Sequence, residues 1–255
     1  MTVNPYETDA LLAQYLLFHY GCHGDQLPWQ QGPTDALEYP TRTVTALLDD
    51  SRLGSDSRAL DLGCAVGRSS FELARYCGEV LGIDYSQRFV DAAEMLRKRG
   101  SIPYRFPVEG SIEEEAVAVL PQAIEVERVS FQQGDACALD SKLSSFDVVH
   151  MANLIDRLPD PMLCLQRLPA LVKPGGQLLI TSPFTWLEEY TPTEKWLGGR
   201  TDMSAAPLGT EAALCEILAP DFTLDFRTDL PFVIREHARK YQWSMAFGGR
   251  WIRHL

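Results

Sequence analysis

The stretch DLGCAVG, residues 61–67, combines an acid with two glycines at a spacing suited to ligand binding. Glycine lets the backbone approach a ligand closely, and the carboxylate of Asp61 favours a cationic group, either directly or by orienting the loop and its water. Gly63 and Gly67 form G-x-x-x-G followed by Arg68, which matches neither the phosphate loop G-x-x-x-x-G-K-[ST] nor the dinucleotide motif G-x-G-x-x-G. The motif therefore predicts a loop that holds a positively charged ligand.

Acids also follow two later apolar runs. Asp84 follows the apolar run in VLGIDYS, 17 residues beyond Gly67, where a carboxylate can accept both hydroxyls of a ribose. Asp135 follows Gly134 in SFQQGDACAL, placed to receive an exocyclic amine such as that of adenine. A single strand that ends in aspartate is common and says little about function. Several such strand ends in this order are a more specific sign of a ligand site.

A parallel sheet would position these loops, because ligands of α/β sheets bind at the carboxyl ends of the strands. Strands are predicted at 58–62, 79–83, 128–133, 146–151 and 176–181, and helices near 68–76, 86–99 and 159–172. This alternation favours an α/β fold with helices on both faces. Helices are also predicted at 7–21 and 41–53, on either side of a Gly- and Pro-rich loop at 22–40. The turn KPGG precedes the fifth predicted strand. Residues 222–255 are predicted to form a closing antiparallel pair of strands.

The composition limits the classes of partner. The 255 residues are 45% hydrophobic, enough for a sizeable core, and a formal net charge of −12 disfavours nucleic acids and anionic membranes. Six cysteines without C-x-x-C or Cys/His clustering indicate reduced thiols, with neither a zinc site nor a disulfide framework. No apolar run approaches the roughly 20 residues that span a bilayer, and no signal-peptide pattern is present. We expect a cytoplasmic protein with a small-molecule partner and no metal, and the oligomeric state stays open.

Over residues 57–183 these motifs resemble the class I S-adenosylmethionine-dependent methyltransferases. The resemblance implies a Rossmann-like fold with a mostly parallel seven-stranded sheet, a closing antiparallel strand and an N-terminal helical extension. It implies S-adenosylmethionine as cofactor, with DLGCAVG on the methionine and sulfonium side, Asp84 on the ribose and Asp135 at the adenine. Tyr6, Tyr39 and Arg42 precede the first strand in a region able to fold over the cofactor. The expected cofactor-binding residues are Asp61, Gly63, Cys64, Gly67, Asp84, Tyr85, Asp135, Ala136, Asn153, Tyr6, Tyr39 and Arg42, with no chemistry assigned to the Cys64 thiol.

Three segments outside the cofactor motifs carry a closer resemblance. NPYETDALLAQYLLFHYG (4–21), TSPFTWLEEYTPTEKWLGG (181–199) and FVIREHARKYQWSMA (232–246) resemble the ovothiol-pathway methyltransferases, free-standing or fused to a sulfoxide synthase. The resemblance implies methylation of an imidazole nitrogen of 4-mercaptohistidine (5-thiohistidine) to give ovothiol A. The chain has no room for the iron-dependent synthase domain, so a separate sulfoxide synthase is the implied pathway link. We expect one methyltransferase domain, with a helical cap at 1–56, the cofactor-binding core at 57–183 and an acceptor-side insertion with C-terminal strands at 184–255.

Methyl transfer to nitrogen requires the lone pair and the methyl carbon to be about 3–3.5 Å apart, so positioning dominates. A mercaptoimidazole sheds a proton readily, and a hydrogen-bond acceptor that selects the tautomer can replace a strong base. No catalytic base is assigned, and the positioning candidates are Asn153, Asp156, Tyr190 and His237. The expected substrate residues are Glu188 and Glu189 for an ammonium, Arg157, Lys195, Arg200 or Arg235 for a carboxylate, and Phe184, Trp186, Tyr190, Trp196 or Trp243 for the ring.

Other interpretations of these residues stay open. Trp186 and Trp196 can pack the insertion against the sheet, the glutamates can be solvated, and His237 can be a structural histidine. The segment 181–200 either closes over the ligand as a lid or covers the sheet edge statically. A methyltransferase for a quinone precursor or an amine shares every cofactor motif, and a non-catalytic S-adenosylmethionine-binding protein would keep the fold. A nucleic-acid methyltransferase is disfavoured by the charge and by the lack of an N-P-P-[YF] motif.

Overall fold

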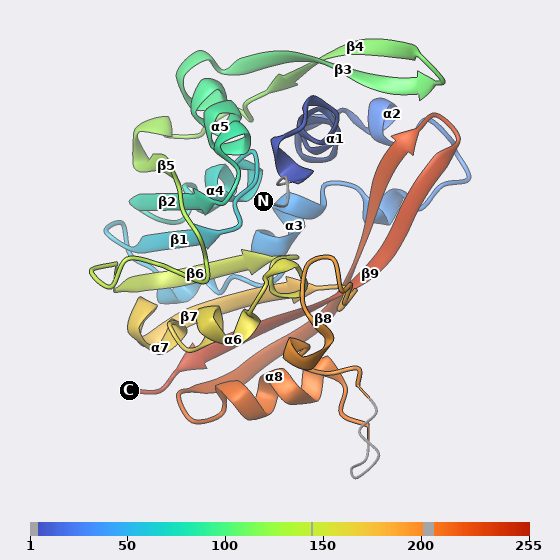
Figure 1. The fold of residues 1–255 in the computed structure, drawn as a ribbon. Coiled ribbons are helices and arrows are strands. Elements are labelled where there is room, and N and C mark those ends of the chain that lie inside the picture. Colours follow the sequence, from blue (N-terminus) through green and yellow to red (C-terminus); the bar gives the residue numbers. More distant parts are fainter. Residues whose placement is uncertain (1–4, 144, 201–206) are drawn as a thin grey trace.

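Seven strands form one sheet in the computed structural model, which describes residues 5–143, 145–200 and 207–255 (Figure 1). The strand order is β5-β2-β1-β6-β7-β9-β8. The pairs from β5 to β7 are parallel, whereas β9 runs antiparallel to both β7 and β8. The strands are β1 (Arg58–Leu62), β2 (Glu79–Asp84), β5 (Val129–Gln133), β6 (Phe146–Ala152), β7 (Val172–Ser182), β8 (Phe222–His237) and β9 (Lys240–Arg253). The predicted Rossmann-like architecture with a closing antiparallel strand is confirmed.

Helices cover both faces of this sheet (Figure 1). They are α1 (Asp9–Tyr20), α2 (His23–Gln26), α3 (Tyr39–Thr45), α4 (Arg68–Leu73), α5 (Gln87–Arg99), α6 (Pro161–Leu165), α7 (Leu168–Leu171) and α8 (Thr210–Leu218). The single-turn 3-10 helices are Pro5–Glu7, Thr34–Ala36, Asp50–Arg52, Val126–Arg128, Ile155–Arg157 and Thr193–Lys195. In the described ranges no helix combines the length and the apolar content that crossing a membrane requires.

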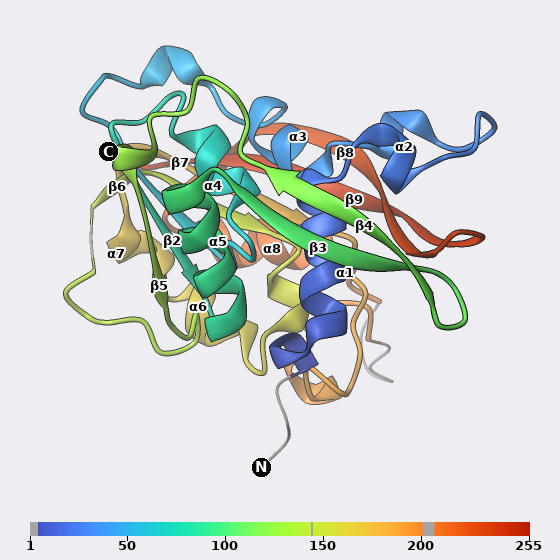
Figure 2. The ribbon, with the colours of Figure 1, turned by 90° about the horizontal axis from the view of Figure 1, so that it is seen from above.

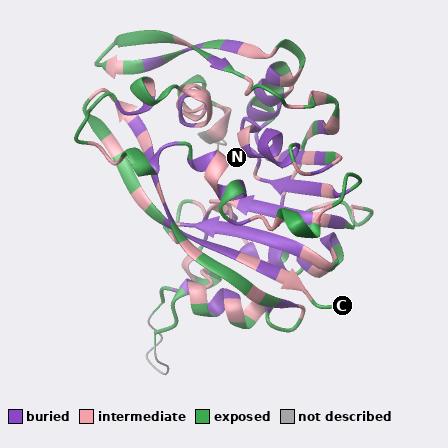
Figure 3. Cartoon of the chain, turned by 180° about the vertical axis from the view of Figure 1, so that it is seen from behind, coloured by how far each residue is buried: buried purple, intermediate pink, exposed green. Residues whose placement is uncertain are grey.

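Alternating strand residues supply two hydrophobic cores, one on each face of the sheet. In β1, Ala59 packs in the core that contains α3, α4 and α5, whereas Leu60 packs in the core that contains α6, α7 and α8. In β7, Leu179 belongs to the first core and Leu178 to the second. Figure 3 shows the central strands as a buried layer. Strands buried on both faces produce continuous apolar runs, which is why the sequence predicted them.

Two predicted helices are each split in the structure. The segment 41–53 forms α3 and then a 3-10 turn, because the Asp49 side chain accepts a hydrogen bond from the Ser51 N–H and starts a new turn. The segment 159–172 forms α6 and α7, and Pro169 lies in the first turn of α7, where its missing N–H costs no helical hydrogen bond. Local caps and prolines therefore interrupt patterns that look continuous by apolar spacing.

A second sheet, β3 (Ser101–Glu109) paired antiparallel with β4 (Ile112–Val119), was not predicted (Figure 2). Ile102, Tyr104 and Phe106 are buried in the core beside α1. They alternate with exposed residues that include Pro103 and Pro107. Proline is depleted in strands because it lacks the N–H donor, so the alternation was masked.

The paired strands β8 and β9 extend beyond the carboxyl edge of the sheet. Ser182, the last residue of β7, pairs with Phe247, whereas the β8–β9 pairing continues to His237. Figure 1 shows this ribbon reaching toward the β3–β4 hairpin, and the Ala238 N–H donates to the Val108 carbonyl at 3.1 Å. The ribbon therefore adds a wall beyond the carboxyl ends of the strands.

Candidate functional site

The glycine loop follows β1 at the carboxyl edge of the sheet. Gly63 and Gly67 have left-handed φ values of +73° and +85°. A Cβ at Gly67 would lie 2.6 Å from the ring of Phe131, and a Cβ at Gly63 would lie 2.9 Å from the side chain of Leu154. Conformation and space therefore both require glycine at these two positions.

Asp84, at the end of β2, holds the same loop. Its Oδ2 accepts a hydrogen bond from the Ala65 N–H and its Oδ1 accepts one from the Ser86 N–H, both at 2.8 Å. Burial raises the pKa of the Asp84 carboxyl to about 6, although the two hydrogen bonds lower it. The carboxyl is therefore ionised at neutral pH, and each oxygen keeps a lone pair for another donor, such as a ribose hydroxyl.

Asp61 lies beneath the loop, 1% exposed, with both carboxylate oxygens engaged. The Ser70 hydroxyl donates to Oδ2 at 2.5 Å, and Nδ1 of His150 lies 2.7 Å from Oδ1. The other ring nitrogen of His150 lies 3.0 Å from the hydroxyl of Thr43, in α3. These contacts join the end of β1 to α4 and, through His150, to β6 and α3.

Asp135 lies beside Asp84 at the neighbouring strand end. The Gly134 N–H donates to the carbonyl oxygen of Asp84 at 2.9 Å, which joins the ends of β5 and β2. Asp135 is partly exposed, Ala136 is buried, and Tyr85 is 60% exposed at the rim. The structure thus brings the expected ribose and adenine residues together.

Asn153 follows β6 in a left-handed conformation, with a φ of +51°. Its N–H donates to the Thr181 carbonyl at 2.8 Å, and its Oδ1 accepts from the Tyr39 hydroxyl at 2.7 Å. The Tyr39 hydroxyl also lies 2.8 Å from that of Thr181, and Tyr39 is only 2% exposed. Non-glycine residues in strained conformations concentrate at functional sites. Tyr39, expected as a cofactor contact, has its hydroxyl bound to Asn153 and Thr181.

Arg42, another expected cofactor contact, has its guanidinium engaged within the protein. Its Nε donates to the Leu37 carbonyl at 2.9 Å, and its Nη2 donates to the Pro231 carbonyl. Burial lowers the pKa of the guanidinium. These contacts join the segment before α3 to the β8–β9 ribbon, and they do not bring Arg42 to the glycine loop.

The N-terminal 3-10 turn contacts the segment after Asp84. The Tyr6 carbonyl accepts a hydrogen bond from the Ser86 hydroxyl at 3.1 Å. The ring centroid of Tyr6 lies 6.1 Å from that of Tyr15 and 6.4 Å from that of Tyr190. Burial raises the pKa of the Tyr6 phenol, and burial together with the Asp84 charge raises that of Tyr15 to about 12. Tyr15 was not predicted as a site residue, and its place on the predicted N-terminal helix was its only signal.

Asp156 ties the turn after β6 to the segment after β7. Its Oδ1 accepts from the Ser182 hydroxyl, and its Oδ2 accepts from the Thr185 N–H and from Arg157, each at 3.0 Å. Burial raises the pKa of the Asp156 carboxyl. The Arg157 guanidinium lies 4.9 Å from the ring centroid of Tyr190. The positioning candidate Asp156 therefore holds Arg157 and the start of the insertion in place.

Two aromatic residues of the insertion stack on each other, and a third stacks on β9. Trp186 and Trp196 stack with ring centroids 6.3 Å apart. Their indole N–H groups donate to the Thr210 hydroxyl at 2.9 Å and to the Thr191 carbonyl at 2.8 Å, respectively. These contacts favour the packing interpretation of both tryptophans. Phe184, with a φ of +55°, stacks on Phe247 of β9 at 5.5 Å.

Other expected substrate residues are not brought to the glycine loop. Lys195 pairs with Asp160 at 2.8 Å, Glu188 accepts from Thr193 at 2.6 Å, and Glu189 is exposed. Arg200 donates to the Glu194 carbonyl at 2.9 Å. Arg235 donates to the Asp25 carbonyl, and its guanidinium lies over the ring of Phe106. His237 accepts from the Arg239 N–H at 3.3 Å. Trp243 is 54% exposed on the β8–β9 ribbon.

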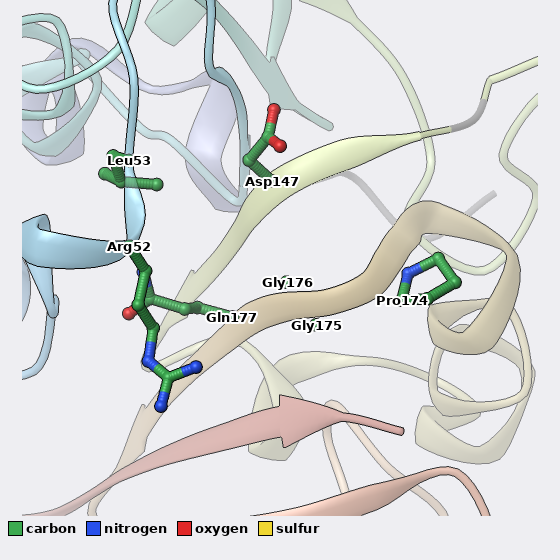
Figure 4. A pocket seen from close by; sticks show the side chains of 7 residues that line it. All are labelled: Arg52, Leu53, Asp147, Pro174, Gly175, Gly176 and Gln177. Atoms are coloured by element: carbon green, nitrogen blue, oxygen red, sulfur yellow. The ribbon is translucent and has the colours of Figure 1, made fainter. Parts of the chain in front are cut away.

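A hollow of about 170 Å³ opens at the opposite, amino-terminal edge of the sheet (Figure 4). It is lined by Arg52, Leu53, Asp147, Pro174, Gly175, Gly176 and Gln177. It is remote in the fold from the glycine loop, because parallel strands carry their starts and their ends on opposite edges. Within the described residues no cluster of His, Cys, Asp and Glu is suited to a metal ion, and all six cysteines are free thiols.

Known proteins are similar to this chain in sequence and in fold. Residues 60–180 match a family model described as "Methyltransferase domain". The chain is 25% identical over 123 residues to a ubiquinone biosynthesis O-methyltransferase of Coxiella burnetii, covering 48% of this chain and 42% of that protein. It is 25% identical over 190 residues to a demethylmenaquinone methyltransferase of Lactococcus lactis, covering 72% and 55%. The chain therefore spans about half the length of these curated relatives.

A solved structure extends the likeness to nearly the whole fold. It is the N-methyltransferase NodS of Bradyrhizobium japonicum in complex with S-adenosyl-L-homocysteine, with a TM-score of 0.54 and 18% identity. The match covers 95% of this chain and 98% of that structure. At this identity the likeness concerns the fold, and it includes the N-terminal helices and the C-terminal strands as well as the central sheet.

Proposed function

We propose that this protein, which belongs by fold and by its matched domain to the class I S-adenosylmethionine-dependent methyltransferases, methylates an imidazole nitrogen of 4-mercaptohistidine to give ovothiol A. The observation that carries the proposal is the contact between Tyr6 and Tyr190 beside the loop that Asp84 begins. It joins the N-terminal segment to the insertion, two of the three segments with the closer family resemblance. A separate sulfoxide synthase would supply the mercaptohistidine.

The strand ends fit S-adenosylmethionine. The glycine loop has no side chain at Gly63 or Gly67, and the ionised carboxylate of Asp84 keeps acceptor capacity for ribose hydroxyls. Asp135 lies beside it for the adenine amine. When bound, the cofactor supplies an electrophilic methyl group on a sulfonium. In this proposal residues 57–183 hold the cofactor, 1–56 cover it and 184–255 face the acceptor.

The residues around the acceptor favour hydrogen-bond donors over bases. The phenols of Tyr6 and Tyr15 stay protonated, since burial raises the pKa of both. Asn153 uses its amide oxygen for Tyr39, so its N–H groups remain for other partners. An acceptor at this position therefore has to bring its own free lone pair. A mercaptoimidazole does so, because the ring sulfur takes the negative charge and the attacking nitrogen needs no further deprotonation.

Charged residues near Tyr190 suit the amino-acid end of such an acceptor. Arg157 lies over the Tyr190 ring and keeps guanidinium donors beyond those used by Asp156 and the Thr185 carbonyl. It is our choice for the carboxylate. Glu189 is our choice for the ammonium, because Glu188 already accepts from Thr193.

Turnover of labelled S-adenosylmethionine tests the proposal against a panel of mercaptohistidine, histidine and quinone precursors. We expect transfer to mercaptohistidine and little transfer to histidine, whose ring lacks the sulfur. Equal turnover of the two would overturn the proposed selectivity. The absence of transfer to either would overturn the proposed substrate.

A quinone precursor is the second candidate acceptor, favoured by the printed functions of the two curated relatives. Transfer confined to the quinone precursors in the same panel would establish it. Binding of S-adenosylmethionine without transfer to any panel member would instead favour a non-catalytic binding protein.

A further inference from the structure

Asn153 lies at the end of β6, next to the glycine loop. Its φ of +51° is left-handed, and the next residue, Leu154, packs so closely on the loop that a Cβ at Gly63 would lie 2.9 Å from it. In the sheet, β6 lies between β1 and β7 (Figure 1). Asn153 therefore lies between the loop expected at the sulfonium and the insertion after β7, which is expected to face the acceptor.

The side-chain amide of Asn153 is held at one end only. Its oxygen accepts a hydrogen bond from the Tyr39 hydroxyl at 2.7 Å. Its nitrogen has no hydrogen-bond partner among the residues that the structure describes, and it is not one of their buried unpartnered atoms. The nitrogen is therefore open to solvent, with two N–H donors available.

The hydrogen bonds of the Tyr39 hydroxyl determine which end of the amide faces it. A phenol has one proton, and this one has two neighbours, the Asn153 oxygen and the Thr181 hydroxyl at 2.8 Å. When the Tyr39 proton goes to Asn153, the Thr181 hydroxyl donates to the Tyr39 oxygen, and all three groups are paired. The reversed amide would donate to the Tyr39 oxygen and send the Tyr39 proton to Thr181. The Thr181 proton would then have no acceptor among the described residues, which costs free energy because Thr181 is 0% exposed.

Packing keeps the Tyr39 hydroxyl in this place. Tyr39 is buried, and its ring centroid lies 6.0 Å from that of Phe18 in α1 and 4.7 Å from that of Phe232 in β8. Helix α1 is itself joined to the glycine loop, because the Tyr20 hydroxyl donates to the Val66 carbonyl at 2.8 Å. Burial raises the pKa of the Tyr39 phenol, so the phenol keeps its proton. Tyr39 is thus a fixed donor between the N-terminal helices, the β8–β9 ribbon and the strand ends.

We propose that Tyr39 is a positioning residue that determines acceptor specificity: by holding the amide oxygen of Asn153, it presents the amide N–H groups to the acceptor. These groups donate to the acceptor atom that carries negative charge, which in mercaptohistidine is the ring sulfur, and they leave the attacking nitrogen free. The inference rests on the proposed function and adds to it the group that recognises the sulfur.

Calorimetric titration of mercaptohistidine into the complex with S-adenosylhomocysteine, which has no methyl group to transfer, tests this role. Tyr39→Phe keeps the ring between Phe18 and Phe232 and removes the hydroxyl, so the amide is free to reverse. We expect mercaptohistidine to bind about three- to tenfold more weakly, whereas the affinity for S-adenosylhomocysteine alone changes less than about twofold. Thr181→Val is the matched control, because it removes the other hydrogen bond of the same hydroxyl and leaves the amide held. Its affinity for mercaptohistidine should change less than about twofold.

A double-mutant cycle shows whether Tyr39 acts through Asn153. Asn153→Gly removes the side chain and tolerates the left-handed φ. Adding Tyr39→Phe to Asn153→Gly should then change the affinity for mercaptohistidine less than about twofold. Asn153→Asp keeps an oxygen for Tyr39 and places a second oxygen where the N–H groups were. It should weaken mercaptohistidine at least about tenfold, and this result stands even if Tyr39→Phe lowers the melting temperature.

Five results would overturn the inference. They are unchanged mercaptohistidine binding by Tyr39→Phe, equal weakening by Thr181→Val, equal weakening of S-adenosylhomocysteine alone, further weakening when Tyr39→Phe is added to Asn153→Gly, and unchanged binding by Asn153→Asp. Failure of the unaltered protein to bind mercaptohistidine would instead overturn the proposed function. The same variants would then be titrated with the phenolate of a quinone precursor, whose negative charge lies on an oxygen.

Discussion

Two regions of this molecule meet at the carboxyl ends of the strands and are built in different ways. At the cofactor edge, formed by the loops after β1, β2, β5 and β6, the predicted acids and glycines lie together. At the acceptor wall, formed by residues 184–200, the predicted residues diverge: Tyr190 meets Tyr6, the two tryptophans stack on each other, and Lys195 pairs with Asp160. Position relative to a strand thus predicts where a side chain lies, whereas the composition of a loop does not.

The largest expected effect is on the cofactor edge. Asp84→Ala is expected to weaken S-adenosylhomocysteine binding by about 2–4 kcal/mol, because charge-assisted hydrogen bonds to the ribose are lost. The change also leaves the Ala65 and Ser86 N–H groups without this acceptor. Calorimetric titration measures the loss, with Asp91→Ala on the exposed face of α5 as the control. Near-native affinity would remove Asp84 from the site.

The acceptor wall has its own anchor in Asp156. Asp156→Ala is expected to lower the free energy of unfolding by about 2–3 kcal/mol, because the Ser182, Thr185 and Arg157 donors lose a buried partner. The KM for the acceptor should rise, while the Kd for S-adenosylhomocysteine changes less than about twofold. Chemical denaturation, steady-state kinetics and titration measure the three quantities. An equal loss of cofactor affinity would show that the two regions are one cooperative unit.

The pH dependence of cofactor binding tests the role of Asp84 at the cofactor edge. The pKa of Asp84 is raised to about 6, so protonation below pH 6 removes the charge that we propose binds the ribose. Cofactor affinity should fall about tenfold, or about 1.4 kcal/mol, for each unit below that value. The ligand-free protein should respond oppositely and lose stability as pH rises from about 4 to 6, because the folded state holds this proton more tightly than the unfolded state. Asp84→Asn should flatten both profiles, and a persistent slope would assign them to another group.

The smallest expected effect concerns motion of the acceptor wall. Hydrogen exchange across residues 184–197 should slow only when cofactor product and mercaptohistidine are both bound, if the insertion closes as a lid. Exchange in α1 should already slow with the cofactor product alone, because α1 joins the two cofactor loops. Identical exchange of 184–197 with and without the acceptor would establish the static cover and shift the substrate residues to the N-terminal segment.

The sequence by itself determined the central sheet and the edge of that sheet at which the predicted acids and glycines lie. A strand buried on both faces is a continuous apolar run, and the loop that follows a parallel strand always emerges at the same edge, so local spacing was enough to group Gly63, Gly67, Asp84 and Asp135. The same reasoning missed β3, because Pro103 and Pro107 interrupt the alternation that predicts a strand. It also missed β4, whose residues are mostly exposed and include three successive glutamates.

Only the tertiary structure determined which distant residues form hydrogen bonds with one another. Tyr39 reaches Asn153 from 114 residues away, Arg42 reaches the Pro231 carbonyl across 189 residues, and Arg235 turns away from the acceptor wall toward the Asp25 carbonyl. These partners lie far apart in the sequence, and the local sequence pattern around one residue does not indicate which distant residue it will contact. The packing of α1, α3 and the β8–β9 ribbon around the strand ends brings these residues together. Buried polar groups there form hydrogen bonds with one another because leaving them unpaired costs free energy.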